Sequence, residues 1–379
     1  MCAFKKEKHT MFIFFLLLPI IYIAGSIYLY IKLIKATKKR SLALTIAASL
    51  LFWLATASFF ISMAMRNGEL PHIVTGTMFR TGSLWTIFII YTSFIALVID
   101  ITRLIFQKFQ CTTLHACIIS TALLAYGHYN YRNPDIVPLD ITVEKPMEGS
   151  LKIAVISDLH LGYGTGKSTL KRFVNIVNNQ NPDLILIAGD LIDNNVGAVR
   201  AELLEEELSL LQAPQGIYMA PGNHEYISGY EECEEFLKHT PIKMLRDSVV
   251  NLPCGAQLLL RDDVFNKQRL KIKKILALAD NNRPTIFIDH NPKEIGKKNE
   301  LGIDIQIGGH THHGQVWPGN YITDYIYEQS HGYRKWSHSH VWISSGLSLW
   351  GPPIRLGTNG DIAIITLRGT ATSQQKQAN

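Results

Sequence analysis

Cysteines are scarce in this sequence, and their spacing indicates neither a disulfide framework nor a structural zinc site. There is no CxxC pair and no dense group of cysteines. The sequence also has no internal repeat. A small disulfide-stapled fold is therefore excluded, while the redox compartment stays open. The five cysteines are Cys2, Cys111, Cys117, Cys233 and Cys254.

An excess of positive charge is also missing from the larger, C-terminal part of the chain. Up to Asp135 there are 13 Lys and Arg against 4 Asp and Glu, which leaves 24 against 27 for the remainder. A nucleic-acid-binding module normally carries its positive excess on the part that touches phosphate. The overall charge of +6 therefore belongs to the N-terminal region, and nucleic acid is not expected as a partner.

Long apolar runs fill the first third of the chain. With 379 residues the chain exceeds the usual span of one hydrophobic core, so two units are expected. Residues 1–130 hold four apolar stretches, at about 10–34, 41–65, 82–106 and 111–126, and the first three are long enough for a bilayer. A signal peptide does not fit, because the first stretch is too long and three others follow. We expect about four transmembrane helices.

The side of the membrane follows from the basic loops. The connection between the first two stretches is the densest, with Lys32, Lys35, Lys38, Lys39 and Arg40, so it should be cytoplasmic. Four spans then place the C-terminal domain on the outer, periplasmic side of a bacterial inner membrane. Two observations oppose this placement. Lys5, Lys6 and Lys8 favour an inward N-terminus, and loss of the fourth span would reverse the side.

One charged pair lies inside the third stretch. Asp100 and Arg103 are one helical turn apart near its end, where a mutual ion pair or snorkelling would reduce the cost of burying them. A proton or ion path is the alternative interpretation. A lone pair near a helix end is usually structural, and we do not expect a transporter.

From about residue 140 the pattern changes to short apolar runs that alternate with amphipathic segments, which predicts an α/β domain over residues 140–369. Two helices are expected, at Ser168–Asn179 and Val199–Leu211, and residues 370–379 read as a polar tail. The predicted strands are Lys152–Ser157, Leu184–Ala188, Ile217–Ala220, Thr285–Ile288, Ile303–Ile307, Val341–Ser344 and Ile362–Leu367.

Five of these strands run directly into polar clusters. Strand ends on one edge of an α/β sheet converge in space, so side chains distant in sequence can meet there. Each cluster alone is commonly turn or capping chemistry, but all five in order make a set of metal ligands. The clusters are Asp158-Leu159-His160, Gly189-Asp190, Gly222-Asn223-His224-Glu225, Asp289-His290 and Gly309-His310-Thr311-His312-His313.

Carboxylate, imidazole and amide ligands of this kind suit phosphate-ester hydrolysis. That reaction needs a strong nucleophile at neutral pH and cancellation of charge on the transferred group. Two divalent metals about 3.5 to 4 Å apart supply both. A carboxylate that bridges the two ions is then required.

These clusters resemble the signature of the calcineurin-like metallophosphoesterase superfamily, over roughly Lys152–Leu367. The resemblance implies a β-sandwich flanked by helices, with two divalent ions at the C-terminal ends of the strands. Manganese is the first choice, and iron or zinc also suits such a mixed oxygen and nitrogen site. The implied ligands are Asp158, His160 and His312 for the first ion, Asp190 as the bridge, and Asn223, His290 and His310 for the second. His224 would be the catalytic imidazole, with Glu225 orienting it.

The surroundings of the last cluster are similar to one branch of that superfamily, called YkuE/YaeI-like or transmembrane protein with metallophosphoesterase domain. The shared features are Gly314-Gln315-Val316, Ser345-Gly346 and the preceding apolar helices. One part of this branch resembles enzymes that cleave the pyrophosphate of UDP-2,3-diacylglucosamine in lipid A synthesis. His313 stands where the branch more often has Gly, so it is either an extra pocket donor or a bystander.

The segment after this cluster is rich in aromatic residues, which suit either a water–lipid boundary or a packed core layer. Its members include Trp317, Tyr321, Tyr325, Tyr327, Tyr333, Trp336, Trp342 and Trp350. Three functions stay open: a phosphoesterase acting on a lipid-linked or membrane-proximal substrate, a soluble phosphodiesterase tethered to membrane lipid, and a non-catalytic metal-binding sensor. The complete ligand set favours an enzyme. The oligomeric state is not predicted.

Overall fold

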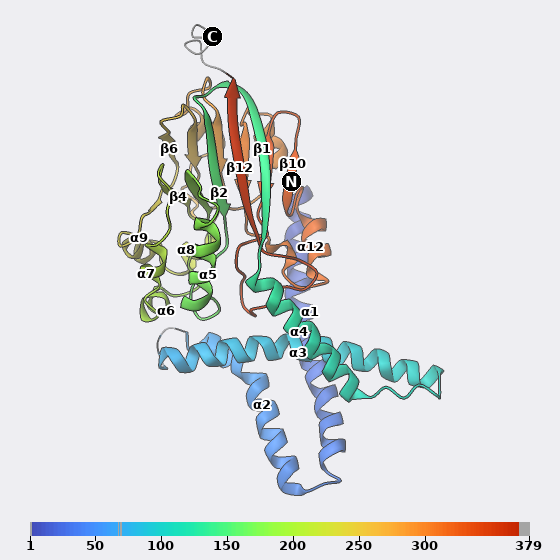
Figure 1. Cartoon of the computed structure of the whole chain (residues 1–379). Coiled ribbons are helices and arrows are strands. Elements are labelled where there is room, and N and C mark those ends of the chain that lie inside the picture. Colours follow the sequence, from blue (N-terminus) through green and yellow to red (C-terminus); the bar gives the residue numbers. More distant parts are fainter. Residues whose placement is uncertain (1, 67, 69, 371–379) are drawn as a thin grey trace. The chain divides into compact units, whose positions relative to one another are not determined.

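The computed structural model describes residues 2–66, 68 and 70–370, with side chains from residue 16 onward in these ranges. The expected polar tail therefore lies outside the described residues apart from Thr370, as do the side chains of Lys5, Lys6 and Lys8. The chain divides into two compact units (Figure 1). One comprises Met1–Asn130 with Gly351–Leu356, and the other comprises Tyr131–Trp350 with Gly357–Asn379.

The first unit is built from helices. They are α1 (Cys2–Thr37), α2 (Leu42–Ala64), α3 (His72–Ile105) and all but the last two residues of α4 (Thr113–Arg132). Among the described residues three segments are long and apolar enough to cross a membrane: Leu16–Thr37, Leu42–Ala64 and His72–Ile105. Helix α4 forms where a fourth span was expected. It is not one of the three, because its last five residues, from His128 to Arg132, are largely polar.

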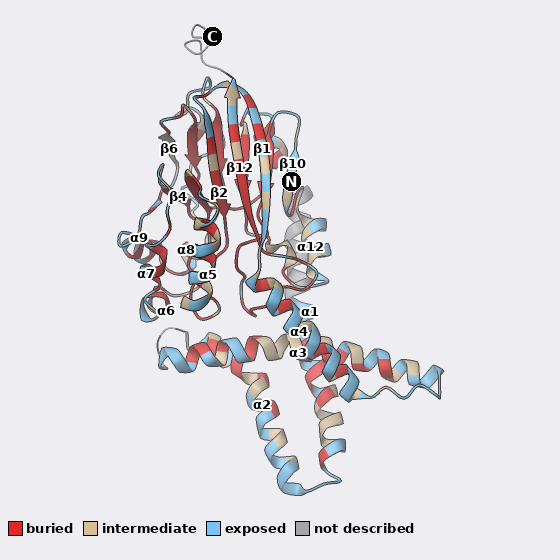
Figure 2. Cartoon of the chain, in the orientation of Figure 1, coloured by how far each residue is buried: buried red, intermediate tan, exposed pale blue. Residues whose placement is uncertain are grey.

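The helices of the first unit pack closely through small residues and expose apolar ones. A Cβ atom on Gly82 would lie 2.3 Å from the backbone nitrogen of Phe59, so α3 can approach α2 only with glycine there. Leu50, Leu54 and Leu104 are exposed, and Figure 2 shows such exposed positions along α2 and α3. Exposed large apolar side chains on long helices suit contact with lipid.

Asp100 finds its partners on another helix. Its Oδ2 accepts a hydrogen bond from Nζ of Lys32 and one from the hydroxyl of Tyr28, each at 2.6 Å. The ion pair therefore joins α3 to α1, and the salt bridge of Asp100 in the described chain is to Lys32 and not to Arg103. Lys32 and Asp100 both lie near the C-terminal ends of their helices, so the ion pair brings these two ends together.

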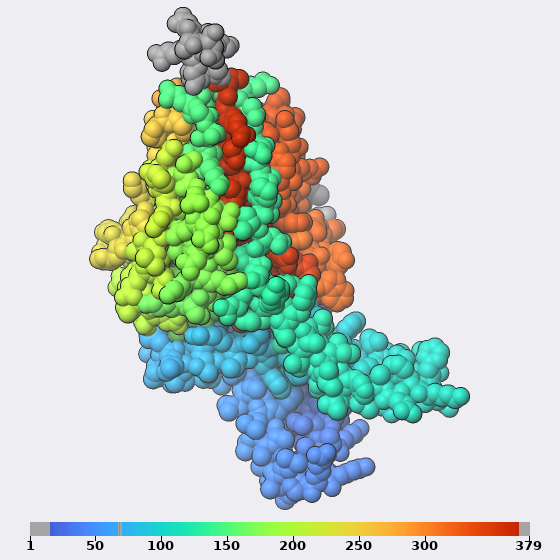
Figure 3. Space-filling view, viewed as in Figure 1, coloured from blue at the N-terminus to red at the C-terminus, as the bar shows by residue number. Residues whose placement is uncertain are grey.

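The second unit contains two six-stranded sheets. The first sheet has the order β1 (Asp135–Pro146), β12 (Asp361–Thr370), β2 (Ser150–Ile156), β3 (Leu184–Ala188), β4 (Ile217–Ala220) and β5 (Ile242–Met244). Strands β2 to β5 are parallel, and β12 is parallel to β1 but antiparallel to β2. In Figure 3 the red strand β12 is visible between the green β1 and β2.

The second sheet has the order β10 (Gly332–Lys335), β11 (His340–Ile343), β9 (Ile305–Gly308), β8 (Thr285–Ile288), β7 (Gln257–Leu260) and β6 (Ser248–Asn251). Its four central strands are parallel, and its two edge strands are antiparallel to their neighbours. Several central strands are buried along their whole length, which explains why they read as unbroken apolar runs.

The two sheets face each other across one hydrophobic core. Val155 and Leu186 of the first sheet share that core with Leu258 and Ile286 of the second. The outer face of the first sheet packs against α5 (Lys167–Asn178), α6 (Val196–Ala201), α7 (Leu204–Leu208) and α9 (Tyr230–Leu237). The outer face of the second sheet packs against α10 (Ile272–Leu276) and α11 (Ile295–Asn299). The expected β-sandwich flanked by helices is confirmed.

Three short elements complete this unit and bear on the site: α8 (Asn223–Ile227), the 3-10 turn η1 (His312–Gly314) and α12 (Gly319–Ile326). The helix expected over Val199–Leu211 is broken in two. Leu203 has a left-handed backbone, with φ of 52°, and separates α6 from α7. A single continuous helix is incompatible with that conformation.

Candidate metal centre

The five polar clusters follow the carboxyl ends of parallel strands from both sheets. Strands β2, β3 and β4 of the first sheet lead to Asp158, Asp190 and Asn223, while β8 and β9 of the second lead to His290 and His310. Contacts between the sheets show that these ends meet: Nε2 of His290 lies 3.1 Å from Oδ2 of Asp190. The sandwich thus brings side chains from both halves of the domain to one place.

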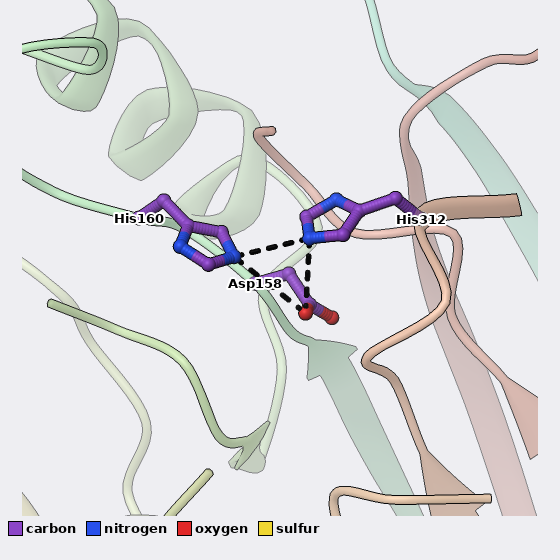
Figure 4. Close-up of side chains that lie close together, drawn as sticks. All are labelled: Asp158, His160 and His312. Carbon is purple, nitrogen blue, oxygen red and sulfur yellow. Dashed lines mark hydrogen bonds and ion pairs between the residues drawn. The ribbon is translucent and has the colours of Figure 1, made fainter. Parts of the chain in front are cut away.

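Asp158, His160 and His312 form the first cluster (Figure 4). The Nε2 atoms of the two histidines are 3.0 Å apart, and they lie 3.8 Å and 3.4 Å from Oδ1 of Asp158. All three side chains turn one donor atom toward the same point. The Asp158 carboxylate is held in place by the backbone N–H of His310, which donates to both of its oxygens at 3.1 Å.

Asp190, His290 and His310 form the second cluster. Nδ1 of His310 is 3.0 Å from Oδ1 of Asn223, so the amide oxygen expected among the ligands also reaches this cluster. Asp190 also lies close to the first cluster, and it forms a further group of possible ligands with His160 and His224. Its Oδ2 is 3.1 Å from Nε2 of His290 and 3.7 Å from Nε2 of His160. One carboxylate therefore connects the two groups of ligands.

The side chains fit divalent metal ions. Nδ1 of His290 is 2.6 Å from the carbonyl oxygen of Ala188, which fixes the ring and leaves Nε2 to face Asp190. That Nε2 is buried, and its close neighbour in the described chain is Oδ2 of Asp190, at 3.1 Å. A histidine tied at one nitrogen to a backbone carbonyl is the usual arrangement of a metal ligand. Imidazole, carboxylate and amide donors together suit first-row divalent ions.

The charges in the site favour deprotonated carboxylates. Burial raises the pKa of Asp190, but His290 and His224 outweigh it and hold that pKa well below its usual value. Burial also raises the pKa of Asp158, and His312 and His160 reverse the effect. Burial and His290 lower the pKa of His310 to about 4, which leaves this imidazole neutral. Ionised carboxylates and neutral imidazoles are the forms that bind metal.

The pKa of His160 is raised, whereas that of His310 is lowered. Burial lowers the pKa of His160, but Asp158 and Asp193 raise it to about 10. The proton that these carboxylates stabilise occupies the same donor atoms that a metal ion would use. A bound divalent cation therefore competes with that proton.

Five of the seven expected ligands have a left-handed backbone. The φ angle is 54° at Asp158, 43° at His160, 53° at Asp190, 73° at His310 and 49° at His312. Residues with a Cβ atom adopt this region rarely and at an energetic cost. Such strain collects where the surrounding fold forces side chains into a functional arrangement.

Glycines in three motifs are required by close approach to the ligands. A Cβ atom on Gly222 would lie 2.2 Å from Oδ1 of Asp190, and one on Gly309 would lie 2.4 Å from Oδ2 of Asp158. Gly189 has a φ of 82°, and its Cβ would lie 2.6 Å from Nδ1 of His290. The glycines before Asp190, Asn223 and His310 thus clear the space in which the ligands meet.

The side chains of His224 and Glu225 make contacts with different parts of the site. The His224 ring packs edge-on against His160, and its backbone N–H donates to Oδ1 of Asp190 at 2.9 Å. Glu225 was expected to orient the His224 ring. Its carboxylate instead accepts hydrogen bonds from the backbone N–H groups of Asp190, Leu191, Ile192 and Gly222, at 2.7 to 3.2 Å. Glu225 therefore fixes the two loops, and its pKa is raised by burial and by Asp190.

Asp193 holds the His224 ring and was missed by the sequence reasoning. Nδ1 of His224 is 2.5 Å from the carbonyl oxygen of Asp193 and 3.2 Å from its Oδ1. The same Oδ1 lies 3.4 Å from Nδ1 of His160. The signal that could have found it is a second carboxylate in the Gly189-Asp190 loop, three residues after the bridge.

A helix-flanked β-sandwich with two ligand clusters joined by one carboxylate defines a metal-dependent hydrolase. The comparisons agree: the calcineurin-like phosphoesterase family matches residues 151–314. An uncharacterized metallophosphoesterase of Helicobacter pylori (strain J99) is 34% identical over 256 residues, covering 65% of this chain and 68% of that protein. The chain therefore belongs to the calcineurin-like phosphoesterase family and is a metal-dependent phosphoesterase.

Two further comparisons extend over similar parts of the chain. The transmembrane protein with metallophosphoesterase domain of Danio rerio is 30% identical over 278 residues, which cover 68% of this chain and 62% of that protein. The 5'-nucleotidase precursor of Thermus thermophilus is a solved structure with a TM-score of 0.36 and 15% identity. That match covers 57% of this chain and 55% of the other.

Proposed function

We propose that this chain is a membrane-anchored phosphoesterase with a binuclear metal site, in which metal-activated water hydrolyses a phosphate ester. The observation that carries the proposal is Oδ2 of Asp190, which faces His160 of one cluster and His290 of the other. Asp158, His160 and His312 would hold one ion, Asn223, His290 and His310 the other, with Asp190 shared. Two such ions, when bound, would supply an acidified water and neutralise charge on the phosphoryl oxygens.

Three side chains near the metal ligands have proposed roles: one donates a proton and two hold parts of the site in place. His224 is the proposed catalytic imidazole: its ring is partly open to solvent, while Asp193 occupies its Nδ1 side. Burial and His160 lower the pKa of His224, but Asp190 and Asp193 outweigh them and raise it. A raised pKa favours the protonated ring, the form that can donate a proton to the leaving or phosphoryl oxygen. Glu225 acts indirectly, by holding the loops of Asp190 and Asn223 together.

Manganese is the proposed ion, and iron or zinc is compatible with the same ligands. The donor set mixes carboxylate and amide oxygens with imidazole nitrogens, and ions of this series compete for such sites according to availability.

A lipid-linked or membrane-proximal substrate is proposed from the aromatic segment after His312. Trp317, Tyr321 and Tyr325 are exposed, and the latter two belong to α12. Helix α12 is joined tightly to the metal-binding turn, since a Cβ on Gly314 would lie 2.1 Å from the backbone carbon of Gly319. Exposed tyrosine and tryptophan suit a boundary between water and lipid. Trp342, in contrast, is buried between the sheets and does not contribute to this exposed aromatic surface.

The catalytic domain is proposed to face the cytoplasm. Three spans, with the basic Lys35–Arg40 connection inside, bring the chain back to the inner side after α3. The ion pair of Lys32 with Asp100 supports this, because it places the end of α3 beside the end of α1 that enters the basic connection. The four-span expectation gives the outer side. Protease added to intact spheroplasts should leave a cytoplasmic domain uncut and would cleave a periplasmic one.

A cytoplasmic domain favours one narrower candidate, hydrolysis of a nucleotide-linked lipid of the UDP-2,3-diacylglucosamine type, because such donors occur on that side. The direct test uses full-length protein in detergent with Mn²⁺, offered a long-chain lipid phosphoester, a UDP-linked lipid and a soluble nitrophenyl diester. Hydrolysis should exceed that of the Asp190→Asn variant for at least the lipid substrates. If the wild type and Asp190→Asn both hydrolyse every substrate only at the background rate, the result would instead support a non-catalytic sensor.

A further inference from the structure

A third cluster of metal-ligating side chains lies next to His312 in the chain but outside the two clusters described above. His313, Asp324 and His331 each place one ligand atom within 4.8 Å of the others. Nε2 of His313 is 3.6 Å from Oδ1 of Asp324, and Nδ1 of His331 is 3.9 Å from the same oxygen. The two imidazole rings are stacked, with centroids 3.4 Å apart and an interplanar angle of 15°.

The cluster is assembled from three segments that are already fastened together. The backbone N–H of His313 donates to Oγ1 of Thr311 at 3.1 Å, and that hydroxyl donates to the carbonyl oxygen of Ser330. The Ser330 hydroxyl donates in turn to Oδ1 of Asp324 and lies 3.1 Å from Nδ1 of His331. The turn η1, helix α12 and the connection to β10 therefore lie together, and an ion at Nδ1 of His331 would replace the contact of that nitrogen with Ser330.

Consecutive histidines serve different clusters. Nε2 of His312 lies 3.4 Å from Asp158 in the catalytic site, whereas Nε2 of His313 lies 3.6 Å from Asp324. Both residues have a left-handed backbone, with φ of 49° and 47°. The left-handed backbone of His313 is energetically costly, and His313 is not one of the expected catalytic ligands. The catalytic site therefore does not account for this strain.

The donor spacing suits a small tetrahedral ion. Bonds of about 2.0 to 2.1 Å in tetrahedral geometry separate the ligand atoms by about 3.4 Å. The two distances to Asp324 exceed this by a few tenths of an ångström. Because the rings are stacked, one of them must also rotate out of the stack for both nitrogens to face the same ion. Asp324 and His331 are 46% and 43% exposed at the side chain, so water can complete the coordination. Two imidazoles and one carboxylate are a set that Zn²⁺ favours.

We propose that His313, Asp324 and His331 form a third divalent-metal site, of the zinc type, that fixes helix α12 to the turn carrying His312. Its ion joins Asp324, in the last turn of α12, and His331, in the connection that follows this helix, to that turn. Because α12 carries the exposed Tyr321 and Tyr325, this site sets the position of the aromatic surface beside the catalytic metals. The site is independent of the reaction proposed above, since none of its ligands belongs to the catalytic clusters.

Metal counting tests the site. Full-length protein in detergent is saturated with Zn²⁺, freed of excess ions and analysed for zinc per chain by atomic emission. The wild type should hold three ions, and His331→Ala and Asp324→Asn should each hold two. His331→Cys, which restores a zinc ligand, should again hold three. His338→Ala is the matched control, an exposed histidine of the same region outside the cluster, and should hold three.

A second measurement separates this site from the catalytic one. In an Asp190→Asn background the catalytic ions are reduced, yet His331→Ala should still remove one further ion. Zn²⁺ should also raise the unfolding midpoint of the wild type by more than that of His331→Ala. The same zinc content in wild type, His331→Ala and Asp324→Asn overturns the proposal. If His331→Ala fails to fold, the folded Asp324→Asn variant decides.

Discussion

Oδ1 of Asp193 lies 3.2 Å from Nδ1 of His224, which makes Asp193 the carboxylate that orients the proposed catalytic imidazole. Asp193→Asn should lower kcat about 10- to 100-fold, the usual cost of losing such a supporting partner. Because Asp193 also lies 3.4 Å from His160, the assay needs saturating metal. The amide keeps the shape of the side chain and removes its charge. An unchanged kcat with both ions bound would contradict the assignment.

His224→Ala should separate chemistry from metal binding. The imidazole is assigned to proton donation and not to coordination, so kcat should fall by roughly 10² to 10⁴ while the metal content persists. Steady-state kinetics together with metal analysis on one preparation check this. Loss of an ion in His224→Ala would make His224 a ligand, because it also belongs to a candidate group with His160 and Asp190.

Asp190→Asn should abolish activity and reduce the catalytic metal content to about one ion or none. An amide carries no charge, so it cannot neutralise two cations from the position between the clusters. Metal analysis and turnover of a soluble diester are the measurements. Near-normal turnover with both ions present would show that Asp190 does not bridge.

Gly222→Ala should reduce both metal content and stability. The added Cβ would lie 2.2 Å from Oδ1 of Asp190, a distance that forces the carboxylate or the loop to move. We expect a loss of about 1 to 3 kcal/mol in unfolding free energy, as for other overpacked buried positions. Gly296→Ala is the control, since its Cβ would have no neighbour nearer than 3.8 Å. Equal unfolding midpoints for the two variants would show that the loop yields freely.

Tyr321→Ala tests the lipid-facing surface of α12. If the substrate is amphiphilic, the variant should lose kcat/KM on a long-chain substrate and spare a short soluble diester, because only the former loses apolar contact. Leu278→Ala, another exposed apolar residue, should affect neither. Equal losses on both substrates in Tyr321→Ala would indicate a general packing defect instead.

The strands that carry the ligands were predictable because they are buried on both faces. Runs such as Leu184–Ala188 and Thr285–Ile288 are continuous and apolar, and both match the observed strands at each end. Strands β1, β5, β6, β7 and β10 were not predicted. Strands β5 and β7 are only three and four residues long. Strands β1, β6 and β10 have exposed or half-exposed residues at most positions, so no apolar run marks them. Their existence depends on pairing with neighbours that are distant in sequence.

The candidate metal ligands could be recognised in the sequence because each follows a strand end, whereas their supporting contacts could not. The position of Glu225 beside His224 suggested direct contact, but the short helix α8 directs the carboxylate to backbone amides of another loop. Asp193 reaches the ring because its loop folds back after Asp190, a path that a single sequence does not reveal. The third cluster needs the packing of Gly314 on Gly319, which brings α12 back to His313.

Strand β12 has a consequence for the order in which the domain can be completed during synthesis. It is the last strand in the described chain, yet it is inserted between β1 and β2, two of the first to be translated. Asp361 at its start also accepts hydrogen bonds from the hydroxyl of Ser344 and the backbone N–H of Ser345. A ribosome-bound chain that ends before this strand leaves β2 with an open edge beside the ligand-bearing loop. The membrane helices emerge first, so the nascent protein is anchored before its catalytic sheet can close.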